Sequence, residues 1–178
     1  PGARIRPGDL VASGHRARPA SHEVRRTPTL LYSIPVTPPS VPGDPGLRAL
    51  LAPRAIAVLG ASDDPVKIGG RPLAFLLRYQ YGGKVYPVNP SRTTVQGLPA
   101  FASISDVPAP VDLAVVVVPA EAVEPALEAA AVHGVRAAIV FSSGFAEVGG
   151  AGREAQARLT ALAHRTGLRI VGPNCQGI

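Results

Sequence analysis

The segment 56–70 constrains the fold of this chain more than any other part of the sequence. An apolar run over 56–59 ends at Gly60, and after a polar turn Gly69 and Gly70 precede a stretch with helical spacing. A buried strand that ends in a glycine turn directs backbone N–H groups at the space above the sheet, where phosphate groups commonly bind. The segment therefore predicts a nucleotide-like ligand. Ser62 stands where the dinucleotide-binding fingerprint has its second glycine, so the spacing departs from that fingerprint.

Short apolar runs alternate with helical stretches from Leu47 onward. The expected strands are 56–59, 85–88, 113–118, 137–141 and 169–171, and the expected helices are 71–81, 123–133 and 152–166. Continuous apolar runs are typical of parallel strands that are covered on both faces. The predicted fold class is α/β: a Rossmann-like, doubly wound, mostly parallel five-stranded sheet with helices on both faces. Pro125 would lie in a first helical turn, and Gly134 and Gly167 would end helices.

Residues 1–46 differ in composition from the rest of the chain, because they are rich in proline and arginine and have no clear helical or strand period. Such a segment buries too little apolar surface to offset its ordering entropy, so we expect a disordered tail. An arginine-rich targeting peptide is the alternative, but its nine prolines oppose an amphipathic helix. Residues 47–178 would form a single domain that is truncated at its C-terminal end. The absence of methionine indicates a fragment of a longer protein.

Composition excludes several classes of function. The net charge of +6 is divided evenly between the tail and the domain, and only four Phe and four Tyr are present, which argues against nucleic-acid binding. No apolar stretch approaches the roughly 20 residues that a membrane span needs. The single Cys175 excludes an intrachain disulfide and a multi-cysteine metal site. We therefore expect a soluble, cytoplasmic protein without a nucleic-acid or membrane partner and without a metal.

Ligands of open α/β sheets bind at the carboxyl ends of the strands, so the loops that follow the strands form the candidate site. In the first loop, Ser62, Lys67 and the N–H groups near Gly69 and Gly70 could meet an anion, although an exposed turn lysine explains Lys67 equally well. Asp63 and Asp64 would repel a phosphate placed directly on them, so we expect them to face away or to cap the turn.

The second loop discriminates between ligands. NAD requires a carboxylate after the second strand, but this chain has Asn89 there. Arg92 offers a guanidinium suited to a phosphate on the ribose, as in NADP or coenzyme A, and an ordinary surface arginine is the alternative. Cys175 has no partnered base in the sequence, so an inert thiol is favoured over a nucleophile. His133 and His164 fall in last helical turns, where they complement the helix dipole.

Five motifs in this order and spacing resemble a known family. They are the stretch 47–62, Val-Tyr-Pro-Val-Asn-Pro, Asp-Leu-Ala-Val-Val-Val-Val-Pro-Ala, Ser-Ser-Gly-Phe-Ala-Glu and Val-Gly-Pro-Asn-Cys. Over 47–178 the chain resembles the CoA-binding domain of the ADP-forming acyl-CoA synthetases, related to the α subunit of succinyl-CoA synthetase. The same domain is also fused to GNAT-type protein lysine acetyltransferases.

The resemblance implies a role for each loop. The first would hold the coenzyme A phosphates, the second would flank the adenosine end, the third would line the adenine and pantetheine path, and the fourth would lie towards the thiol end. The implied contacts are Gly60, Ser62, Lys67, Gly69, Pro90, Arg92, Val118, Pro119, Ala120, Ser142, Ser143, Asn174 and Cys175. In the synthetases the last two residues begin a helix that faces a phosphorylated histidine of the next domain. This chain ends before that helix could form, and its four histidines match no such position.

Three hypotheses for function follow. The first is the CoA- or acyl-CoA-binding domain of an ADP-forming acid–CoA ligase, which in the full enzyme converts an acid, CoA and ATP to acyl-CoA, ADP and phosphate. Such a fragment would lack the downstream ligase and nucleotide-binding domains, so we expect no catalytic residue in it and no turnover by it alone. The second is a CoA-sensing regulatory domain of a fused acetyltransferase. The third is an NAD(H)-binding redox sensor, which Asn89 disfavours. Coenzyme A would be a substrate or ligand that is not tightly held, and the chain could form a homo-oligomer.

Overall fold

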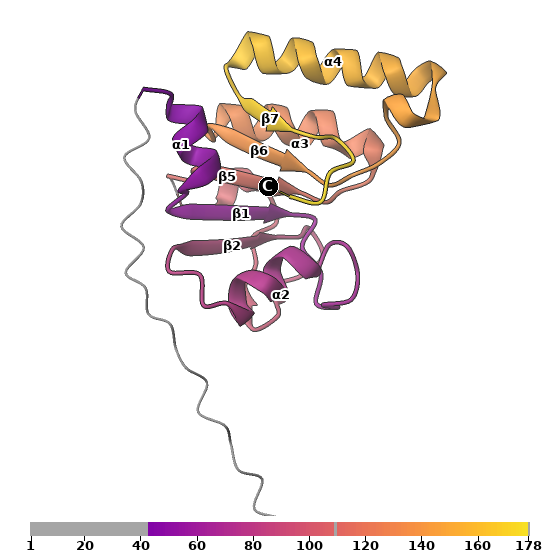
Figure 1. Ribbon diagram of the computed structural model, residues 1–178. Coiled ribbons are helices and arrows are strands. Elements are labelled where there is room, and N and C mark those ends of the chain that lie inside the picture. The colour runs from indigo at the N-terminus through magenta and orange to yellow at the C-terminus, as the bar shows by residue number, and fades with distance from the viewer. Residues whose placement is uncertain (1–42, 109, 178) are drawn as a thin grey trace, which may run out of the picture. The chain divides into compact units, whose positions relative to one another are not determined.

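A five-stranded parallel sheet forms the centre of the computed structural model, which describes residues 43–108 and 110–177 (Figure 1). The strand order is β2-β1-β5-β6-β7, and every neighbouring pair is parallel. The strands are β1 (Ala55–Leu59), β2 (Lys84–Val88), β5 (Leu113–Val116), β6 (Ala137–Val140) and β7 (Arg169–Val171). After β2 the chain crosses to β5 on the other side of β1, so the direction of winding reverses between β1 and β5. Ligands of open α/β sheets bind beside such a reversal.

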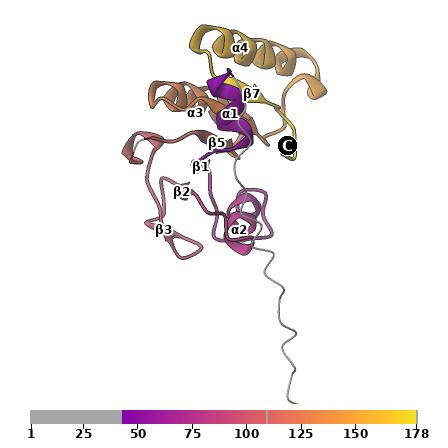
Figure 2. The same cartoon turned by 60° about the vertical axis from the view of Figure 1, so that its left-hand side comes forward.

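Helices cover both faces of this sheet, which confirms the predicted fold class (Figures 1 and 2). They are α1 (Pro45–Leu51), α2 (Arg71–Arg78), α3 (Ala120–Val132) and α4 (Gly150–Thr166). One set of alternate strand residues, including Ala57 and Val116, packs with Leu127 of α3 and Leu162 of α4. The other set, including Val58, packs on α1 and α2. Burial of each large apolar side chain contributes roughly 1.5–3 kcal/mol to folding.

The short helix α1 was not expected from the sequence, and it begins inside the stretch predicted to be a tail. Asp44 caps it, because its Oδ1 accepts the N–H groups of Gly46 at 2.8 Å and Leu47 at 3.2 Å, and Pro45 occupies the first turn. These N–H groups, that of Leu47 foremost, lower the pKa of the Asp44 carboxyl. The first described helix therefore includes Pro45 and Gly46, which the sequence analysis assigned to the tail. The rest of the predicted tail, residues 1–42, lies outside the described residues.

The helix α3 begins earlier than expected, and the predicted position of Pro125 in its first turn is wrong. Pro119 is the N-cap, so Pro125 lies inside the helix and cannot donate to the carbonyl of Glu121. The expected helix ends are confirmed, because Gly134 has φ +88° and Gly167 has φ +73°.

Strands β5 and β6 end earlier than expected, at Val116 and Val140, and α2 ends at Arg78 rather than at 81. Residues 117, 118 and 141 consequently belong to the loops of the carboxyl edge. A hairpin of β3 (Thr94–Val95) and β4 (Leu98–Pro99) was also missed, as were the 3₁₀ turns Ile104–Asp106 and Ala146–Val148. None of the helices within 43–108 and 110–177 is long and apolar enough to cross a membrane.

Candidate functional site

The loops that follow β1 and β5 touch at the point where the winding reverses. A Cβ atom on Gly60, which has φ +87°, would lie 2.9 Å from both the Val117 carbonyl oxygen and Val118 Cγ1. Glycine is therefore required at position 60 by both backbone conformation and space. Two predicted site residues, Gly60 and Val118, are brought together here. Pro119 lies exposed just beyond them, and Ala120 begins α3 half-buried.

Residues 60–70, the glycine loop, fold back on themselves. The Ser62 N–H donates to the Gly69 carbonyl at 3.1 Å, and a Cβ on Gly69 would lie 2.6 Å from the Gly60 carbonyl oxygen. Gly70 donates its N–H to the Lys67 carbonyl at 2.9 Å, so it is not available to a ligand. Within the part of the chain that the structure describes, the N–H groups of Asp63, Ile68 and Gly69 donate to no protein acceptor. Backbone N–H groups without a protein acceptor can bind an anion.

The two aspartates of the glycine loop differ in their contacts, because Asp64 bonds within the loop and Asp63 bonds outside it. Asp64 Oδ1 accepts the Val66 N–H at 2.9 Å and caps the turn, while Ser62 Oγ accepts the Asp64 N–H at 3.2 Å. Asp63 faces the second loop instead, where its Oδ2 lies 3.6 Å from Arg92 Nη1. Lys67 is exposed at the tip of the turn. Neither carboxylate therefore accepts a hydrogen bond from the N–H groups of Asp63, Ile68 or Gly69.

The second loop joins the first through Asn89. Its Nδ2 donates to the Ala61 carbonyl at 2.8 Å, and its Oδ1 accepts the Ser91 N–H at 2.8 Å. An aspartate could accept from the Ser91 N–H but could not donate to the Ala61 carbonyl. The contact between the two loops therefore requires an amide at position 89. Pro90 is exposed beside it, and the Arg92 side chain is 63% exposed. The exposed ion pair of Arg92 with Asp63 is worth about 1 kcal/mol or less, so a phosphate can compete for Arg92.

The remaining loops are tied together through Ser142. Its buried Oγ donates to the Val118 carbonyl at 2.5 Å, and its own carbonyl accepts the Asn174 N–H at 2.9 Å. Ser143 is exposed. The half-buried Cys175 Sγ lies 3.3 Å from the Val140 carbonyl oxygen. The described residues 172–177 contain no helix.

Glu147 accepts a hydrogen bond within the loop after β6. Its Oε1 accepts the Gly144 N–H at 2.6 Å, and this bond, foremost, lowers the pKa of the exposed Glu147 carboxyl from 4.5. Because the folded-state pKa is depressed, the bond stabilises the loop above the ordinary pKa and is lost as pH falls through the lowered value.

The Gly144 amide resonance should therefore shift in an NMR pH titration, with a midpoint below 4.5. The matched control is Glu147→Gln, which keeps an acceptor but does not titrate, so the shift should vanish. A midpoint at or above 4.5 in the parent chain would contradict the contact.

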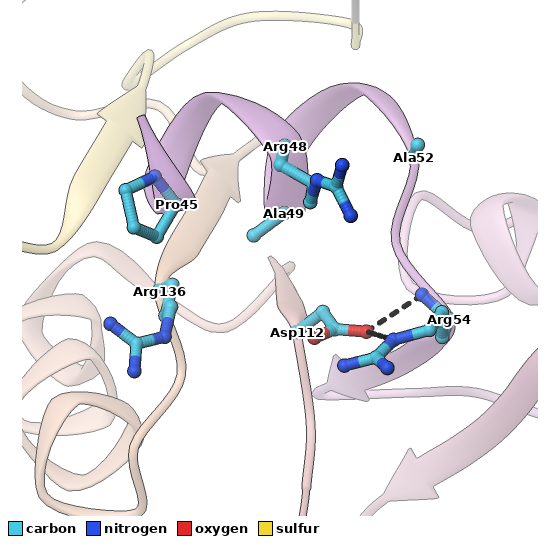
Figure 3. Close-up of a pocket in the computed structure, with 7 residues that line it drawn as sticks. All are labelled: Pro45, Arg48, Ala49, Ala52, Arg54, Asp112 and Arg136. Carbon is cyan, nitrogen blue, oxygen red and sulfur yellow. Dashed lines mark hydrogen bonds and ion pairs between the residues drawn. The ribbon is translucent and has the colours of Figure 1, made fainter. Parts of the chain in front are cut away.

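Among the hollows formed by residues 43–108 and 110–177, we compare one at each edge of the sheet. One of about 260 Å³ adjoins the amino ends of the strands and is lined by Arg48, Arg54, Arg136 and Asp112 (Figure 3). Asp112 is already bonded there, because it accepts the Arg54 N–H at 2.7 Å and lies 3.5 Å from Arg54 Nε. The other, of about 420 Å³, adjoins the carboxyl edge beside Cys175 and is also lined by Phe141. Of these two, the second adjoins the loops predicted to bind a ligand.

Sequence reasoning missed several residues at this edge. Gln96 of the β3–β4 hairpin contacts the glycine loop, and Arg71 and Phe141 line the hollow beside Cys175. Gln96 follows a two-residue strand, which carries no recognisable period, and its partners lie 26 and 34 residues away. No local pattern signals such a contact.

A parallel α/β sheet with a glycine loop at its winding reversal defines the class of domains that bind nucleotide-type ligands at the carboxyl edge. Within that class, the chain belongs to the CoA binding domain family, which it matches over residues 54–178. The family resemblance inferred from the five motifs is confirmed.

Relatives of known type are much longer than this chain. The α subunit of acetate–CoA ligase [ADP-forming] II from Pyrococcus furiosus is 45% identical over 126 residues, which are 71% of this chain and 27% of that protein. The 4-hydroxybutyrate–CoA ligase [ADP-forming] of Nitrosopumilus maritimus is 35% identical over 129 residues, 72% of this chain and 18% of that protein. The chain is thus homologous to one domain of ADP-forming CoA ligases and spans less than a third of each.

A solved structure extends this similarity to the fold. The apo form of the dinucleotide forming acetyl-coenzyme A synthetase 1 of Ca. Korarchaeum cryptofilum has a TM-score of 0.68 and 45% identity. The match covers 72% of this chain and 28% of that chain. The main sequence-based reading, a CoA-binding domain of the ADP-forming ligase type, is therefore favoured over the NAD(H) sensor and the acetyltransferase fusion.

Proposed function

We propose that this chain binds coenzyme A or its thioesters along the carboxyl edge of the sheet, as the coenzyme-binding part of an ADP-forming acid–CoA ligase. The observation that carries the proposal is the glycine loop at the winding reversal of a CoA binding domain, with backbone donors at Asp63, Ile68 and Gly69 that no protein acceptor within the described residues uses. Diphosphate is the part of coenzyme A that such donors suit.

The order of the loops along the edge suggests how the coenzyme would lie. Its diphosphate would meet the glycine loop, with Ser62 Oγ and Lys67 as further partners. The adenosine end would lie toward β2, where Pro90 and Arg92 follow the strand, and Arg92 would bind the 3′-phosphate. The third loop, from Val118 to Ala120, touches Gly60 and would line the path between the two ends.

The thiol end would lie over the loops after β6 and β7. Ser143 is exposed there, Asn174 is bonded to the neighbouring loop, and Cys175 borders the hollow of about 420 Å³. The Ser142 hydroxyl already donates to the Val118 carbonyl, so its contribution would be to hold the edge together rather than to contact the coenzyme.

The chain would supply binding rather than bond-making. In an ADP-forming ligase the acid is joined to the CoA thiol through an acyl phosphate, while ATP is converted to ADP and phosphate. This chain corresponds to less than a third of such relatives, which act on acids as different as acetate and 4-hydroxybutyrate. The parts that choose the acid and handle ATP would lie in further domains.

Calorimetric titration of the purified chain with CoA and NADH tests this function. CoA should bind with measurable heat, and NADH should give none over the same concentration range, because Asn89 supplies no carboxylate to the ribose hydroxyls. Tighter binding of NADH than of CoA would overturn the proposal, and so would the absence of CoA binding by a folded chain.

A further inference from the structure

The β3–β4 hairpin contacts the glycine loop through a single side chain. Gln96 Nε2 donates to the Ser62 carbonyl at 2.8 Å and to the Gly70 carbonyl at 3.0 Å, so both hydrogens of the amide are used. The backbone N–H of Gln96 donates to Asp63 Oδ1 at 2.8 Å. One residue thus bonds near the start and at the end of the loop.

These bonds fix the orientation of a peptide group that a ligand would use. The carbonyl and the N–H of a trans peptide point in opposite directions. Because the Ser62 carbonyl is held toward Gln96, the N–H of Asp63 in the same peptide group points away from Gln96. That N–H is one of the donors that no protein acceptor uses within the described residues.

The backbone at Gln96 is unfavourable for glutamine. Gln96 has φ +47° and Gly97 has φ +81°, the left-handed pair of a type I′ hairpin turn, in which Asn and Gly are preferred. The neighbouring turn position already has glycine. A long side chain held in this conformation is typical of a residue whose side chain is needed.

We propose that Gln96 is a positioning residue, which holds the two ends of the glycine loop together so that its free N–H groups face the coenzyme phosphates. This inference rests on the proposed function. Asp63 takes part, because it accepts from the Gln96 backbone and also lies beside Arg92. The hairpin therefore orients both the phosphate loop and the arginine at the adenosine end.

The test compares the parent chain with Gln96→Gly, which removes the amide and relieves the left-handed backbone. The thermal midpoint should stay the same or rise, while the dissociation constant for CoA should increase about tenfold. A merely structural role would lower the midpoint, whereas a positioning role changes affinity without loss of stability. CoA affinity equal to that of the parent chain would overturn the proposal.

A second variant, Gln96→Asn, tolerates the same backbone and keeps the amide but is one methylene shorter. It should not reach both carbonyls, so CoA binding should weaken as in Gln96→Gly. Hydrogen exchange of the Ser62 N–H in the ligand-free chain separates this inference from the proposed function. Faster exchange in both variants supports the role of Gln96 in holding the two ends of the glycine loop together, even if the parent chain fails to bind CoA. Unchanged exchange contradicts that role.

Discussion

Replacing Gly70 with alanine should lower the free energy of unfolding by about 3 kcal/mol or more and the thermal midpoint by roughly 10 °C. A Cβ at this position would overlap the carbonyl of Asp64, which is backbone and cannot rotate away. The φ of −96° at Gly70 is open to any residue, so the cost comes from the overlap and not from backbone conformation. Thermal unfolding followed by circular dichroism measures the change.

Gly82→Ala is the matched control for this substitution. A Cβ on Gly82 would meet nothing within 4 Å, and its φ is not positive, so the change should leave stability within about 0.5 kcal/mol or raise it slightly. If both variants unfold at the same temperature, the close packing of Gly70 against the Asp64 carbonyl is contradicted.

Arg92→Ala should weaken CoA binding by at least about tenfold while leaving dephospho-CoA binding nearly unchanged, because a charge-assisted bond to phosphate is worth about 1.5–3 kcal/mol. The parent chain should accordingly bind CoA more tightly than dephospho-CoA. Asp63 offers only a weak, exposed competitor at 3.6 Å, so Arg92 is free to turn to the 3′-phosphate. Calorimetric titrations of both proteins with both ligands give the four affinities.

Arg165→Ala controls for net charge. Arg165 is a similarly exposed arginine with a carboxylate partner, Glu128, but it lies in the last turn of α4, before β7 begins. It should bind both ligands like the parent chain. Equal losses of affinity in the two variants would show that overall charge, and not a contact at Arg92, determines CoA binding.

The sheet could be predicted from the sequence because its strands are covered on both faces and so are continuously apolar. The segment 113–116, for example, is wholly buried, and no polar residue interrupts it. The errors fall where other forces decide. The helix α1 depends on the Asp44 cap and on packing of Ala49, and β3 and β4 have two residues each, too few to show a period.

The location of the candidate site was also predictable, because parallel strands place all their following loops at one edge. The hydrogen bonds and ion pairs between its loops were not predictable. The contacts of Gln96 with Ser62 and of Asp63 with Arg92 join residues about thirty positions apart, and only the folded chain brings them together. The sequence analysis interpreted Asn89 only as evidence against NAD. The structure shows that its amide also bonds the second loop to the first, by donating to the Ala61 carbonyl.

The contact between Gly60 and Val118 divides the carboxyl edge into two halves. On one side, Asn89 and Gln96 bond the loops of β1 and β2 to each other; on the other, Ser142 bonds the loops of β5, β6 and β7. Each half is stabilised by its own hydrogen bonds, and the two halves pack against each other at Gly60 and Val118. Under the proposed placement of coenzyme A, substitutions in the loops after β6 and β7 would leave the bonds of Asn89 and Gln96 at the phosphate end intact.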